Sequence, residues 1–145
     1  MTAETKLRTL AAANSSLTAL FGTSPFRWYD VNLPQNQALP NVVVQRISTA
    51  RIQAQDTLLG VGQFAKIRFQ FTCRGQGSNQ PTFEAARAIG AAVIQFLGTV
   101  NLTSGANSLP PRPAYVLGER VGLDYNANPP VPLYLVDAAV WNQET

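Results

Sequence analysis

The residue types that most often carry out catalysis are scarce in this sequence. Its 145 residues include no histidine and one cysteine, Cys73, so Ser-His-Asp catalysis, Cys-His catalysis and His-ligated metal sites are excluded. Asp124 and Asp137 fall on neighbouring predicted strands and could form the carboxylate pair that a glycosidase or a metal site uses. Edge-strand solvation, or a salt bridge to Arg120, explains them better. We therefore expect no catalytic, metal-binding or cofactor-binding residues, no cofactor, and a protein that is not an enzyme.

Two further groups could bind phosphates or nucleic-acid bases. The segment 75–77 (Gly-Gln-Gly) lies between a predicted strand and a predicted helix, but it lacks the third glycine and the Lys-Ser/Thr of a phosphate-binding loop. Arg27, Trp28 and Tyr29 could stack on bases. A packed edge of a sheet is the more economical interpretation of these aromatic residues.

The elements that must position these residues are organised around the stretch 65–74 (Ala-Lys-Ile-Arg-Phe-Gln-Phe-Thr-Cys-Arg). Its odd positions are apolar and its even positions are polar or charged, a period of two that predicts a β-strand with one face on a core. Lys66, Arg68 and Arg74 form a basic stripe on the other face. The stripe could face nucleic acid or the acidic groups of a neighbouring subunit, and we favour the neighbouring subunit.

Two apolar helices are predicted to cover the apolar face of this strand. The first covers residues 3–22, with Asn14 capping its second half and Gly22 closing it. The second covers residues 81–97, with Pro81 as its first residue and Gly98 after its end. Both carry apolar residues at helical spacing.

The remaining periodic segments are predicted strands at 26–31, 41–48, 115–124 and 133–142, with Gly118 and Gly122 as candidate bulges. The chain thus alternates helices with strands in an order typical of an α+β protein. We expect a two-layer sandwich in which a mainly antiparallel sheet of four to five strands is covered by two to three helices. Residues 1–145 are predicted to form a single domain.

Residues 49–63 separate two predicted strands and are too numerous for a tight hairpin turn. Leu58, Leu59 and Val61 would then be apolar groups at an exposed tip. We interpret the segment as a protruding loop or hairpin arm that contacts another protein. A loop folded back on its own core is the alternative.

Charge is low, and it is unevenly distributed. Only 13% of the residues are charged, with a net charge of +3, whereas about a quarter is usual. Such a shortage fits a chain that buries much of its outside against other subunits. No apolar run approaches the ~20 residues of a membrane-spanning helix, so we expect no membrane partner.

Several stretches share a familiar pattern. They are Leu39 to Ser48 (Leu-Pro-Asn-Val-Val-Val-Gln-Arg-Ile-Ser), the helical Phe83-Glu84-Ala85-Ala86 closing with Leu97-Gly98, and the terminal Val140-Trp141-Asn142. Together with the N-terminal helix that closes at Gly22, they resemble the tail completion and tail terminator proteins of long-tailed bacteriophages. The proline-rich loop at 109–113 and the Asn-Pro-Pro loop at 128–130 depart from that pattern.

The resemblance implies a structural virion protein of the phage neck or tail. Such proteins form a ring, expected to have six copies, on the head-proximal end of the tail tube. The ring stops tube polymerisation and provides the head–tail joining surface. The implied partners are other copies of the chain, the tail tube protein, a head-side connector or stopper protein, and genomic DNA that passes through the lumen without sequence-specific binding. The expected location is the virion, and the host cytoplasm during assembly.

The candidate residues for contacts with a neighbouring subunit or the tube come from the arm and from the strands beside it. They are Arg46, Arg51, Asp56, Leu58, Leu59, Val61, Lys66 and Arg68. Two other functions remain open at this point. One is a head-closure or adaptor protein of the neck, and the other is a DNA-binding module that uses the basic stripe.

Overall fold

The computed structural model describes residues 2–30, 38–52, 63–102, 113–127 and 129–144. The elements in chain order are α1 (Ala3–Ala12), α2 (Ser15–Phe21), β1 (Trp28–Asp30), β2 (Asn41–Ile52), β3 (Gln63–Arg74), α3 (Phe83–Leu97), β4 (Ala114–Asp124) and β5 (Val131–Glu144). Among the described residues, no helix has both the length and the hydropathy needed to cross a membrane.

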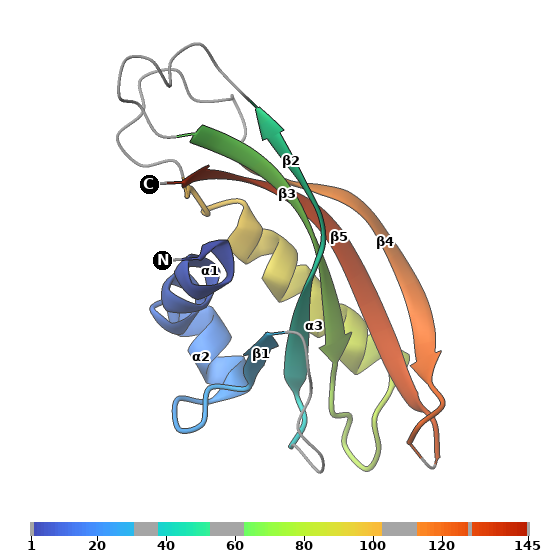
Figure 1. The fold of residues 1–145 in the computed structure, drawn as a ribbon. Helices are drawn as coiled ribbons and strands as arrows, with labels where there is room; N and C mark the ends of the chain where they lie inside the picture. Colours follow the sequence, from blue (N-terminus) through green and yellow to red (C-terminus); the bar gives the residue numbers. More distant parts are fainter. Residues whose placement is uncertain (1, 31–37, 53–62, 103–112, 128, 145) are drawn as a thin grey trace.

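The five strands form one open, curved sheet, and the three helices lie together on one of its faces (Figure 1). The strand order is β1-β2-β3-β5-β4. β1 runs parallel to β2, and every other neighbouring pair is antiparallel. The expectation of an α+β fold, with a mainly antiparallel sheet and helices on one side, is confirmed.

Strand β3 is the centre of the sheet, and its alternating pattern decides where the core lies. Ala65, Ile67, Phe69, Phe71 and Cys73 are completely buried against the helices. β3 pairs with β2 on one side and with β5 on the other over almost its whole length. The period of two in the sequence therefore reports a strand with one face on the core, as predicted.

Side-chain caps set the helix boundaries. Asn14 Oδ1 accepts hydrogen bonds from the backbone N–H groups of Ser16 and Leu17, at 3.0 and 3.2 Å, and so starts α2. Gly22 ends α2 with a φ of 81°, a conformation that glycine adopts without steric cost. Both caps were predicted.

The start of α3 differs from the prediction. Pro81 is not its first helical residue, because the hydroxyl of Thr82 accepts a hydrogen bond from the N–H of Ala85 at 3.1 Å and makes Thr82 the N-cap. The helix then begins at Phe83 and ends before Gly98. Pro81 precedes the cap instead.

The edge of the sheet beside β1 is held by aromatic packing. The Trp28 ring is fully buried. It stacks on Phe26 with centroids 6.1 Å apart and meets Phe71 and Phe96 edge-on at 5.9 and 5.7 Å. The interpretation of Trp28 as part of a packed sheet edge is confirmed.

Two strands contain irregular pairing. The register of β2 shifts between Arg46 and Ser48, and that of β4 shifts between Val116 and Gly118. The bulge predicted at Gly118 is therefore next to an observed one. Gly122 pairs regularly with Leu133, so the second predicted bulge was wrong.

Candidate functional site

The face of the sheet that carries no helix presents the basic stripe of β3. Lys66 and Arg74 are partly exposed there, and Arg68 is exposed. Each cation already has a contact within the chain. Arg68 Nη2 lies 3.5 Å from Asp137 Oδ2, and Arg74 Nη2 lies 3.3 Å from Asp124 Oδ2. The stripe is therefore largely compensated by carboxylates of the same chain.

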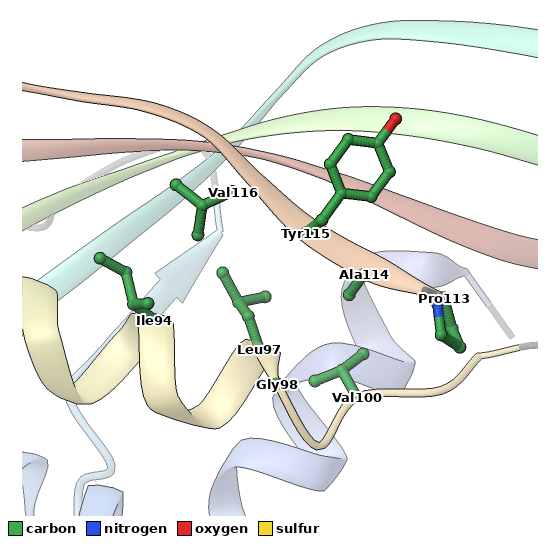
Figure 2. Close-up of a pocket in the computed structure, with 8 residues that line it drawn as sticks. All are labelled: Ile94, Leu97, Gly98, Val100, Pro113, Ala114, Tyr115 and Val116. Carbon is green, nitrogen blue, oxygen red and sulfur yellow. The ribbon is translucent and has the colours of Figure 1, made fainter. Parts of the chain in front are cut away.

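The third cation of the stripe is held by an aromatic ring. Lys66 Nζ lies 5.3 Å from the centroid of Tyr115, within the range of a cation–π interaction. Tyr115 belongs to β4, so the Lys66 side chain reaches across β5 to the edge strand. Figure 2 shows the Tyr115 ring on the side of β4 that points away from α3.

The two aspartates do not form a carboxylate pair. Asp137 lies opposite Gly118, and Asp124 lies opposite Val131, so the two aspartates are offset by six positions along β5. The alternative that their ion-pair partner is Arg120 was also wrong, since the partners are Arg68 and Arg74. The reason is the strand order, which places β5 between β3 and β4. Arginines of β3 can therefore reach Asp137 on β5 and Asp124 on β4.

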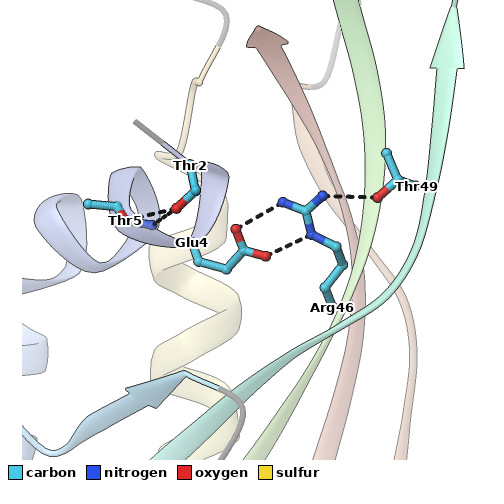
Figure 3. A network of polar contacts seen from close by, with 5 residues as sticks. All are labelled: Thr2, Glu4, Thr5, Arg46 and Thr49. Atoms are coloured by element: carbon cyan, nitrogen blue, oxygen red, sulfur yellow. Dashed lines mark hydrogen bonds and ion pairs between the residues drawn. The ribbon is translucent and has the colours of Figure 1, made fainter.

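Arg46 lies on the opposite face of the sheet, under the helices. Its cross-strand partner is the buried Phe69, and its guanidinium donates to both carboxylate oxygens of Glu4, at 2.7 and 2.9 Å (Figure 3). It also donates to the hydroxyl of Thr49 at 3.1 Å. This bidentate ion pair links α1 to the sheet. Arg46 is therefore separated from Lys66 and Arg68, although the sequence analysis grouped the three.

The ion pair with Arg46 changes the pKa of Glu4. Burial alone would raise the pKa of the Glu4 carboxyl, but the hydrogen bonds and the charge of Arg46 outweigh it. The net effect holds the pKa of Glu4 below its ordinary value. Glu4 is thus ionised when it anchors α1.

The other candidate interface residues are described only in part or not at all. The backbone of Arg51 pairs with Ala65 in the β2–β3 ladder, but its side chain is outside the description. Asp56, Leu58, Leu59 and Val61, which make up the tip of the predicted arm, lie outside the described residues. The β2–β3 ladder reaches Ile52 and Phe64, so the two strands extend further toward this segment than predicted.

Arg27 and Trp28 make their contacts inside the fold. Arg27 Nε donates to the carbonyl of Pro40 at 2.8 Å, and Arg27 Nη2 donates to the carbonyl of Leu20 at 3.1 Å. Trp28 is fully buried. In this conformation neither residue can stack on a base. The sequence contained no signal for these backbone contacts.

A cavity of about 320 Å³ lies between the end of α3 and the start of β4 (Figure 2). The residues that line it are Ile94, Leu97, Gly98, Val100, Pro113, Ala114, Tyr115 and Val116. The cavity holds no cluster of titratable groups. The sequence analysis did not predict this cavity.

The lone thiol is inert in the folded chain. Cys73 is completely buried, and this burial raises the pKa of its thiol to about 12. Within the described residues, no three histidine, cysteine or acidic side chains come together as a metal site would require.

A comparison with protein families matches residues 5–119 to the family described as Tail completion protein gp17. The match covers well over half of the chain. The chain belongs to this family. A search of curated proteins found no match.

A tail completion protein is a structural component of a phage tail, so the chain is located in the virion tail and associates with other tail components. The resemblance noted from the sequence is thereby confirmed. The matched range contains all eight candidate interface residues. It ends within β4 and leaves out β5, whose Asp137 compensates the basic stripe.

Proposed function

We propose that this tail completion protein forms a ring, with six copies expected, that caps the head-proximal end of the tail tube. The ring stops polymerisation by covering the surface on which the next tube ring would assemble, and it provides the joining surface for the head-side connector. The family match over residues 5–119 is the observation that carries the proposal. Assembly takes place in the host cytoplasm before the finished protein is part of the virion.

The charge distribution supports a role in assembly. The chain has few charged residues for its length, and seven of its basic side chains make contacts within the fold. They are Lys6, Arg8, Arg27, Arg46, Lys66, Arg68 and Arg74. A surface with few free charges suits contacts that exclude water. Head-to-tail contacts between identical subunits close into rings when the rotation between copies closes.

The lumen of the proposed ring must let DNA pass without holding it. Phosphate binding is driven by free Lys and Arg side chains that release counterions. Compensation of Arg68 by Asp137 and of Arg74 by Asp124 weakens that attraction. The same compensation argues against a dedicated DNA-binding module. We assign no residue to the lumen wall.

The arm at 49–63 is proposed to contact a neighbouring subunit or the tube. Arg51, Asp56, Leu58, Leu59 and Val61 are its candidate contact residues, and Lys66 and Arg68 are candidates on the adjoining strand. Deleting residues 56–62 should prevent ring stacking or tail joining while the domain still folds. A deletion variant that yields full infectious particles would refute the proposed arm.

The deciding experiment is electron microscopy of the purified protein with and without the tail tube protein of its phage. A ring of this protein at one end of tubes of fixed length is the expected result. In a phage that lacks the protein, overlong tubes are expected. Leaking heads without joined tails, together with a protein that ignores tubes, would overturn the proposal in favour of a head-closure or adaptor protein.

A further inference from the structure

The sheet has two open edges in the part of the chain that the structure describes. β4 is the last strand on one side and pairs only with β5. On the other side, β1 pairs with β2 only over Val42 to Val44. The rest of β2, from Gln45 to Ile52, has no described strand on its outer side. An open edge presents unpaired backbone N–H and C=O groups to which another chain can add.

Two of the residues that protect a sheet edge are absent from both segments. Residues 45–52 and 114–124 contain no lysine and no proline, although each segment has a bulge and other charged residues, which also protect edges. Each exposes a large apolar side chain inside its bulge, Ile47 at 44% and Leu117 at 48% exposure. β4 also exposes Val121, at 63%. Apolar groups gathered on an unpaired strand indicate a contact with another protein.

The two bulges lie at the same height of the sheet. Val116 pairs with Ala138, Ala138 pairs with Phe69, and Phe69 pairs with Arg46. The residue after each end of this row is the bulged one, Leu117 in β4 and Ile47 in β2, and these two residues lie on opposite sides of the row because β2 and β4 run in opposite directions. A copy placed beside the first without a shift along the strands would therefore bring the two exposed side chains close together, at neighbouring levels.

We propose that β4 of one copy pairs antiparallel with residues 45–52 of β2 in the next copy, so that the sheet continues from subunit to subunit. β2 and β4 point in opposite directions because three antiparallel steps separate them (Figure 1). Rotation about an axis that runs roughly along the strands keeps those directions. It therefore brings β2 of the neighbouring copy antiparallel to β4, the pairing found in the rest of the sheet.

The use of both edges favours this head-to-tail contact over a symmetric one. Pairing β4 with β4, or β2 with β2, would leave the other edge of each copy open. A heterologous contact uses both edges of every copy and closes into a ring.

The cavity beside the start of β4 adjoins the proposed contact. It is bounded by Val116 and Ala114 on the strand and by Ile94 and Leu97 on α3 (Figure 2). It thus lies beside the strand that receives the neighbour. An apolar side chain that arrives with the neighbouring β2 can fill it and extend the buried area beyond backbone pairing alone.

The inference rests on the proposed ring, and it is tested by cross-linking. A double variant with Ile47→Cys and Leu117→Cys should give, with a short bis-maleimide, a ladder of covalent oligomers that ends at the size of the ring. A mixture of the two single variants should give covalent dimers only, and each single variant alone should stay monomeric. The fully buried Cys73 makes the wild-type protein the unreactive control.

The outcomes separate this inference from the proposed function. Rings on tubes without a ladder would overturn the strand pairing and leave the tail-capping proposal standing. A ladder of covalent oligomers from a protein that does not bind tubes would support the strand pairing and overturn the tail-capping proposal. A covalent dimer of the Leu117→Cys variant alone would show a symmetric β4 contact and overturn the inference. A protein that forms no oligomer with or without tubes would overturn both.

A charge on the edge provides a second test. Val121→Lys changes an exposed side chain and should leave the melting temperature of the monomer unchanged, while it places an edge-blocking charge on β4. We expect loss of the oligomer. Leu10→Lys on α1 is the matched control, since Leu10 is similarly apolar and 40% exposed but lies on neither edge. A Val121→Lys protein that assembles as the wild type does would refute the pairing.

Discussion

The close approach of α3 to β5 gives a sharp test of the packing, through the substitution Gly90→Ala. Gly90 is buried in the middle of α3, and a Cβ atom there would lie 2.3 Å from Cδ1 and 2.8 Å from Cε1 of Tyr134. Carbon atoms pack best at about 3.5–4.0 Å. The Tyr134 ring or the helix must therefore move by about 1 Å. The Tyr134 hydroxyl donates to the Glu119 carboxylate, so a shift of the ring also disturbs that hydrogen bond.

Two opposing effects set the size of the change in stability. Replacing a helical glycine by alanine stabilises the helix by about 1 kcal/mol, whereas overfilling a packed contact costs about 1–3 kcal/mol. The overlap is severe, so we expect a net loss of about 1–2 kcal/mol in the free energy of unfolding. For a domain of this length, that corresponds to a melting temperature lower by about 3–6 °C.

The assay is thermal and urea unfolding of wild-type and variant proteins. Ala88→Gly, at an exposed position of the same helix, measures the propensity effect alone and should cost about 1 kcal/mol. In a Tyr134→Ala background the clashing ring atoms are gone, so Gly90→Ala should become stabilising there. A Gly90→Ala protein at least as stable as the wild type, or an effect that is the same in both backgrounds, would refute the reasoning.

Three further outcomes are expected. Glu4→Gln should lower the unfolding free energy by about 0.5–1 kcal/mol at pH 7, since the pair with Arg46 is partly exposed. The pKa of Glu4 is depressed, so this contribution is present above its ordinary pKa and is lost as the pH falls; acid unfolding of both proteins should converge, and a constant difference would contradict the pair. The Cys73 thiol, with its pKa raised to about 12 from 9.0 by burial, should resist Ellman's reagent at pH 8 until the chain unfolds, and its contribution to stability should decline as the pH rises through that range. Rapid reaction of the native protein would show that the thiol is accessible. Asp137→Asn frees the exposed Arg68 on the outer face and should raise the affinity for duplex DNA and steepen its salt dependence by about 1 in log–log slope. Fluorescence anisotropy against salt concentration measures this, and an unchanged slope would show that the ion pair does not mask Arg68.

Local patterns predicted much of the fold because local physics decides those features. The alternation at 65–74 identifies a half-buried strand from side-chain direction alone. Asn14 and Gly22 mark helix ends through contacts within a few residues. Where two local signals compete, as at Pro81 and Thr82, the hydroxyl cap decided the boundary. A pattern of that kind does not reveal which of two adjacent residues will make the cap.

The candidate site was harder to predict because it depends on contacts between residues far apart in the chain. Lys66 and Arg68 lie on the outer face as the alternation indicates, but the partner of Arg68 is Asp137 and that of Arg46 is Glu4. Those pairings follow from strand order and from where α1 packs. The sequence contains the charges and does not state which of them meet.

The amino-acid sequence by itself determined the fold class, the positions of the helices and strands, the inert cysteine and membership of the tail completion family. Only the tertiary structure decided that β5 inserts between β3 and β4, that β1 pairs in parallel, and that a bulge after Arg46 changes which positions of β2 face the helices, from even-numbered before it to odd-numbered after it. The physical reason is the period of two in a strand. A single extra residue moves every following side chain to the other face, and whether that residue is accommodated depends on neighbouring strands that are distant in sequence.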